Sequence, residues 1–242
     1  MFLSAALLFL MQPMFGKMIL PVFGGAPAVW ITSLVFFQLM LLAGYLYVHA
    51  TTSWLGPKKQ SVLHAVLLLT PLVILPIKVL SGWGLTSPLR PISSVFLVLL
   101  ASVGLPFFVI STTAPLLQRW FGSTTHTKAR DPFFLYAASN LGSIGALLVY
   151  PSIIEPRFHL DTQAKVWSIG YVLLILLMLA CAIAVRKSLP KTTETTDSND
   201  DAPPVPWKTR LRWIALAAVP SSLMLSVTTH ITTDIAPVPC CG

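Results

Sequence analysis

Residues 166–185 read VWSIGYVLLILLMLACAIAV, a run without a single charged side chain. A helix of roughly 20 apolar residues crosses the hydrocarbon core of a bilayer, so this run predicts a transmembrane helix. Five more mainly apolar runs precede it, at 2–21, 28–49, 62–80, 92–121 and 132–154. The chain is therefore predicted to be all-α, a polytopic transmembrane helical bundle with six complete spans.

The composition agrees with a membrane protein. Of the 242 residues, 55% are hydrophobic and only 10% are charged, and the mean hydropathy is +0.78. A soluble domain has about 25% charged residues, so a soluble enzyme is excluded, as are disordered chains and disulfide frameworks. An outer-membrane barrel needs segments of about 10 residues with alternating polarity, whereas the apolar runs here are continuous.

The C-terminal part differs from the six-span region. Residues 191–206 read KTTETTDSNDDAPPVP and hold four of the eight acidic residues, which is typical of a flexible linker. A seventh apolar segment runs from Trp213 to about Ile235. We therefore predict a six-helix membrane bundle over 1–186, a flexible polar cytoplasmic linker over 187–211, and a seventh transmembrane helix with a truncated end over 212–242.

The basic residues predict the orientation. If the spans alternate in direction, eleven Lys and Arg residues fall on one side of the membrane and four on the other. Cytoplasmic loops carry the excess of Lys and Arg, so the N-terminus is predicted to be cytoplasmic and Gly242 to lie near the outer face. The net charge of +8 then reflects topology. The expected partner is the lipid bilayer, and nucleic acid is not expected.

Three runs predict local distortion or close packing. Residues 92–121 are too many for one straight span and carry Gly104 and Pro106 near the middle, so we expect a tilt, a kink, or an extension of residues 118–120 into the interface. Pro71 and Pro76 predict a bend in 62–80. The small residues of 139–146, SNLGSIGA, favour a close approach of this helix to another backbone.

Polar side chains inside spans are costly, which makes them functional candidates. The amides of Gln12, Gln38 and Asn140 either contact a ligand or hydrogen-bond neighbouring helices. Lys17 either extends to the outer interface or pairs with a buried partner. The full set of solute-binding candidates is Gln12, Lys17, Gln38, Asn140, Glu155, Arg157, His230 and Asp234.

The direction of the helices predicts a polar cluster in the outer half of the membrane. The first, fifth and seventh spans run the same way, so Lys17, the group Glu155 to Arg157, and His230 with Asp234 are expected at one depth. His230 and Asp234 are four residues apart and share a helix face, where the carboxylate can orient the imidazole. The alternative is an ordinary frayed helix end at the interface.

Sequence motifs for conventional catalysis are absent. The chain has no GxSxG, HExxH, P-loop or GxGxxG sequence. Its three cysteines include no CxxC pair, and its five histidines are scattered. We therefore predict no catalytic residue, no cofactor and no metal site in this chain.

Several long stretches, in order, resemble one family. They are FLSAALLFLMQPMFGKMILPVFGGAPAVW (2–30), VFFQLMLLAGYLYVH (35–49), STTAPLLQRWF (111–121), DPFFLYAASNLGSIGALLVYP (131–151), IIEPRF (153–158) and VPSSLMLSVTTHITTDIAPVP (219–239). They are similar to the N-terminal membrane region of the bacterial fused major-facilitator/spermidine synthase family. The resemblance implies a multi-pass protein of the bacterial inner membrane, followed in that family by further helices and a cytoplasmic aminopropyltransferase-like domain.

The resemblance implies no enzyme activity for these residues, because none of them matches that domain's catalytic motif. It suggests a membrane domain that transports or channels a small solute, with a cationic, polyamine-like molecule as one candidate. Glu155 and Asp234 would then supply carboxylates, and His230 a proton-coupled neighbour. Two alternatives stay open: a membrane anchor or assembly subunit that needs a membrane or cytoplasmic protein partner to complete its bundle, and an incomplete fragment of a longer fused enzyme.

Overall fold

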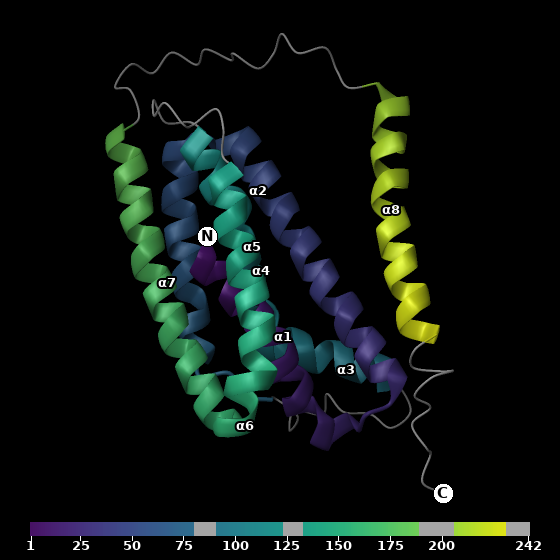
Figure 1. Ribbon diagram of the computed structural model, residues 1–242. Coiled ribbons are helices and arrows are strands. Elements are labelled where there is room, and N and C mark those ends of the chain that lie inside the picture. Colours follow the sequence, from purple (N-terminus) through teal and green to yellow (C-terminus); the bar gives the residue numbers. More distant parts are fainter. Residues whose placement is uncertain (80–90, 123–132, 189–205, 231–242) are drawn as a thin grey trace, which may run out of the picture. The chain divides into compact units, whose positions relative to one another are not determined.

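The computed structural model describes residues 1–79, 91–122, 133–188 and 206–230, and all regular elements among them are helical (Figure 1). Five helices are long and apolar enough to cross a membrane: Phe2–Phe23, Pro27–Gly56, Ile92–Gly122, Phe133–Arg157 and Leu160–Arg186. The predicted all-α, multi-pass membrane architecture is thereby confirmed. The chain divides into two units, Met1–Pro190 and Lys191–Gly242.

The elements follow each other as a series of long helices joined by short distorted turns. In chain order they are α1 (Phe2–Phe23), α2 (Pro27–Leu69), the 3-10 turn η1 (Thr70–Ile74), α3 (Pro91–Leu99), the π turn η2 (Leu100–Gly104), α4 (Leu105–Gly122), α5 (Phe133–Val149), the π turn η4 (Tyr150–Ile154), α6 (Glu155–Arg157), α7 (Leu160–Ser188) and α8 (Trp207–His230).

The helix α2 is two antiparallel arms joined at Gly56. This glycine has φ 67° and ψ 167°, a conformation that side chains with a Cβ rarely adopt. The first arm ends there, and a shorter apolar arm, Lys59–Ile74, runs back along it. Contacts of Tyr47 with His64, and of Thr51 with Gln60, hold the two arms together.

The third predicted span, 62–80, is wrong in its length. Its helix ends at Ile74, which makes the arm Lys59–Ile74 about 24 Å long, shorter than a bilayer core. Pro71 has no N–H for the carbonyl of Leu67, and the Thr70 hydroxyl donates to that oxygen at 2.7 Å instead. Leu75 then turns to an extended conformation, as expected before Pro76. The bend predicted from the two prolines is present as this 3-10 turn.

The predicted distortion of residues 92–121 is confirmed. The π turn η2 lies between α3 and α4 and includes Gly104, and Pro106 follows in the first turn of α4. Figure 1 shows the axes of α3 and α4 pointing in different directions on either side of this turn. Trp120 is 1% exposed and lies inside the bundle.

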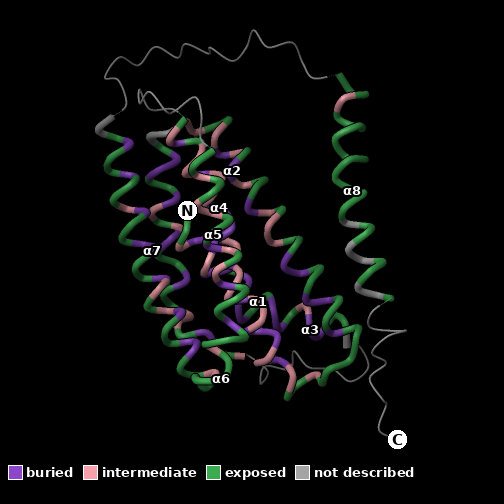
Figure 2. Tube along the Cα trace, viewed as in Figure 1, coloured by how far each residue is buried: buried purple, intermediate pink, exposed green. Residues whose placement is uncertain are grey.

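The core of the first unit forms around α1 and α4. The helix α1 packs most extensively against α5 and also contacts α7 and α4, whereas α2 packs chiefly on α4. Figure 2 shows buried positions along α1 and α4 and many exposed positions on α5 and α7. Apolar side chains on those exposed faces, such as Leu148 and Ile169, suit contact with lipid.

The predicted close approach by residues 139–146 is confirmed at Gly142. A Cβ on this glycine would lie 2.3 Å from the backbone oxygen of Phe2, so α1 and α5 meet backbone to backbone here. Gly145, three residues later, has no atom within 4 Å of an added Cβ. Only one glycine of the motif is therefore needed for the contact.

Two aromatic side chains of α7 hydrogen-bond other helices inside the bundle. Trp167 donates its indole N–H to the carbonyl of Leu7 on α1 at 2.9 Å. Tyr171 donates its hydroxyl to the carbonyl of Leu68 at 2.9 Å, next to the turn where Pro71 supplies no N–H. The two rings are stacked with centroids 5.6 Å apart, so one face of α7 joins α1 to α2.

Replacing Tyr171 with phenylalanine should therefore weaken the bundle. The change removes one buried hydrogen bond and leaves the Leu68 carbonyl short of a donor, a loss of about 1 kcal/mol. The free energy of unfolding in mixed micelles measures it, with Tyr45→Phe as the control because Tyr45 is exposed on α2. Equal stability of the two variants would contradict the assigned role of Tyr171.

The seventh predicted segment is represented by α8, which begins at Trp207, within the stretch predicted as linker. The carbonyl of Pro206 accepts the N–H of Thr209 at 2.9 Å and starts the helix. Residues 231–235 of the predicted span lie outside the described residues. Side chains of α8 from Trp207 to Val219 are mainly exposed.

Candidate functional site

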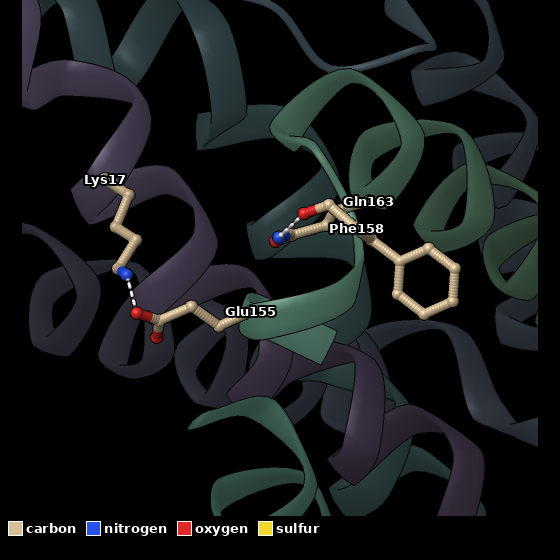
Figure 3. A network of polar contacts seen from close by, with 4 residues as sticks. All are labelled: Lys17, Glu155, Phe158 and Gln163. Atoms are coloured by element: carbon tan, nitrogen blue, oxygen red, sulfur yellow. Dashed lines mark hydrogen bonds and ion pairs between the residues drawn. The ribbon is translucent and has the colours of Figure 1, made fainter. Parts of the chain in front are cut away.

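An ion pair joins two helices of the first unit. The Lys17 ammonium on α1 contacts Oε1 of Glu155, the first residue of α6 (Figure 3). The side chains are 35% and 38% exposed, so each is half-buried. Of the two roles expected for Lys17, the structure shows pairing.

The π turn η4 positions Glu155 at this contact. Pro151 at the start of the turn has no N–H to continue the α-helical pattern of α5. The N–H of Glu155 bonds to the carbonyl of Tyr150, five residues earlier, which closes the wider π turn. The π turn directly precedes the charged residue Glu155. Single π turns of this kind are frequently found at functional sites.

The partial exposure of the pair determines its chemistry. An exposed ion pair contributes about 0–1 kcal/mol to stability. The pair is therefore a weak link between α1 and α6. A carboxylate has two oxygens that accept hydrogen bonds, and in Figure 3 one oxygen of Glu155 points to Lys17 while the other points away.

Arg157 and Gln163 complete this end of the bundle without joining the pair. Arg157 is exposed, and its Nη1 reaches the carbonyl of Ser152 at 3.5 Å. Gln163 on α7 donates its amide N–H to the carbonyl of Phe158 at 2.8 Å, which fixes the turn between α6 and α7 (Figure 3). These two hydrogen bonds fix the chain around Glu155.

The other predicted site residues are not brought to the ion pair by the described contacts. Gln12 is half-buried on α1, and Gln38 and Asn140 are exposed on α2 and α5. His230 ends α8, in the second unit, and Asp234 lies outside the described residues. The expected pairing of His230 with Asp234 stays a prediction.

Sequence reasoning missed a buried polar cluster between the arms of α2 and the end of α4. Gln60, 1% exposed, donates its amide N–H to the hydroxyls of Thr51 and Thr52, both at 2.9 Å. The carbonyl of the same amide accepts the indole N–H of Trp120 at 3.2 Å. Gln60 lies between the predicted spans 28–49 and 62–80 and was therefore not among the intramembrane candidates.

The described residues contain no group of three or more His, Cys, Asp or Glu side chains that could hold a metal ion. Comparisons with known protein families, with curated proteins and with solved structures give no match to this chain. The long apolar helices define the class: this is a multi-pass helical membrane protein.

Proposed function

We propose that this membrane protein moves or channels a small cationic solute, and that Glu155 binds an ammonium group of that solute in place of Lys17. The observation that supports the proposal is the half-exposed Lys17 to Glu155 ion pair between α1 and α6. A primary amine of a polyamine offers the same charge and the same three donors as the lysine ammonium. The exchange replaces one ion pair with a similar one.

The exchange also has a structural consequence. When the solute occupies Glu155, α1 loses its charged link to the turn after α5, and the two segments are free to move relative to each other. A ligand shifts a conformational equilibrium only through its different affinity for the two states. Competition between solute and Lys17 supplies such a difference.

The proposal includes the finer topology expected from the sequence. Alternating passes with a cytoplasmic N-terminus would place the ion pair on the outer side of a bacterial inner membrane. The resemblance to the fused major-facilitator/spermidine synthase family favours a polyamine as the solute.

A non-transporting anchor or assembly subunit is the second candidate. It is supported by the buried polar side chains that link helices: Gln60 with Trp120, and Tyr171 with Leu68. In such a protein the intramembrane polar groups would serve stability alone, and substitutions would lower abundance without changing any flux.

Solute flux distinguishes the two candidates. The full chain is reconstituted in liposomes, and the flux of radiolabelled spermidine is measured for the wild type, Glu155→Gln and Lys17→Met. Glu155→Gln should reduce flux about tenfold or more, the equivalent of about 1.4 kcal/mol of lost interaction. Lys17→Met should increase the apparent affinity for spermidine, since the internal competitor is gone.

The matched control is Asp161→Asn, which neutralises an exposed carboxylate in the first turn of α7. Its flux should equal that of the wild type. Normal flux in Glu155→Gln would contradict the assigned role of Glu155. A wild-type protein that folds but carries no spermidine would favour the anchor.

A further inference from the structure

Three helical segments enclose a buried histidine near the Gly56 turn, at the opposite end of the first unit from the ion pair. His64 on the arm Lys59–Ile74 is 0% exposed. Its ring lies 6.2 Å, between centroids, from Tyr47 on the first arm of α2, and 6.2 Å from Trp120 on α4. The Trp120 ring is nearly perpendicular to the imidazole, at 81°.

The polar atoms of this cluster lack hydrogen-bond partners. Both imidazole nitrogens of His64 and the hydroxyl of Tyr47 are buried, and none of the three bonds to protein. A neutral imidazole has one donor nitrogen and one acceptor nitrogen, and a phenol both donates and accepts. Leaving each such buried group unpaired costs about 1–3 kcal/mol, so a partner for them is strongly favoured.

The neighbouring Gln60 shows that this region otherwise satisfies its polar groups. Its amide donates to two threonine hydroxyls and accepts from Trp120. Beside this satisfied amide, the buried atoms of His64 and Tyr47 are left without a hydrogen bond. Buried groups left over in this way are commonly bonded by internal water, which makes two to four hydrogen bonds in such sites.

We propose that His64 and Tyr47 form an internal binding site for a water molecule, which bonds one imidazole nitrogen and the Tyr47 hydroxyl. Water can donate to one of these groups and accept from the other, so it can satisfy both. The site does not depend on the proposed function at Glu155.

Solid-state NMR of the full chain in lipid, with 15N-labelled histidine, tests the proposal. His64 is assigned by comparison with His64→Phe, and magnetisation is transferred from water to the ring. We expect a neutral imidazole with a hydrogen-bonded nitrogen and a water cross-peak that is weakened or lost in Tyr47→Phe. Tyr45→Phe, which alters an exposed tyrosine two residues away on α2, should leave the cross-peak unchanged.

Two outcomes would overturn the proposal. A His64 ring without any water cross-peak, and with both nitrogens free of hydrogen bonds, would show a dry site. A nitrogen shift that responds to Tyr47→Phe without a water cross-peak would show a direct bond between the two side chains. The water cross-peak and the nitrogen shift are both read on the wild-type protein; the variants assign the signal to His64 and identify the contribution of Tyr47.

Discussion

Gly142→Ala should destabilise the first unit strongly, although it adds only one methyl group. The added Cβ would lie 2.3 Å from the backbone oxygen of Phe2, and a backbone atom cannot rotate away as a side chain can. The helices α1 and α5, which share the largest contact of the bundle, would have to separate. Overpacking of this kind costs about 1–3 kcal/mol, so the unfolding midpoint in detergent and the yield of folded protein should both fall.

Gly145→Ala is the matched control for this prediction. The two glycines lie three residues apart in the same helix, but an added Cβ at Gly145 meets no atom within 4 Å. Alanine is also a better helix former than glycine by about 1 kcal/mol. Gly145→Ala should therefore be neutral or slightly stabilising, and a loss of stability equal to that of Gly142→Ala would contradict the contact described for α1 and α5.

The second large effect is expected for Gln60→Leu. The change removes the acceptor for the indole of Trp120 and the donor to Thr51 and Thr52, all in the interior of the bundle. A buried polar group deprived of its partner costs about 1–3 kcal/mol. We expect a lower free energy of unfolding in mixed micelles, together with a change in the fluorescence of Trp120.

The control for Gln60 is another glutamine of α2. Gln38 is exposed on the first arm, and leucine there presents an apolar surface where lipid is expected. Gln38→Leu should leave the stability unchanged or raise it slightly. An equal loss of stability in both variants would contradict the stabilising role of the hydrogen bonds around Gln60.

The helical architecture was predictable because apolar run length alone indicates a membrane helix. The run 166–185, for example, lies within α7 (Leu160–Ser188). The length of the third span was not predictable from hydropathy, because Pro71 and Pro76 act through the backbone hydrogen bonds that they remove. Hydropathy did predict a connection between the runs 28–49 and 62–80, but not the sharp turn within it, which depends on the backbone conformation of Gly56.

The candidate site was predictable in part. Helix direction placed Lys17 and Glu155 at one depth, and the structure pairs them. The pairing of Gln60 with Trp120 links residues sixty positions apart and depends on how the second arm of α2 packs against α4. Polarity along the sequence cannot specify such a contact, because it depends on the rotation of each helix about its axis.

The proposed topology requires the first unit to cross the membrane repeatedly, with the Gly56 turn and the ion pair on opposite sides. In a variant with all three cysteines replaced by serine, single cysteines are introduced at Trp54, near the turn, and at His159, after α6; both side chains are exposed. Intact cells are then treated with a membrane-impermeant maleimide. We expect labelling of His159→Cys in intact cells and of Trp54→Cys only after permeabilisation; labelling of both from the same side would contradict this topology.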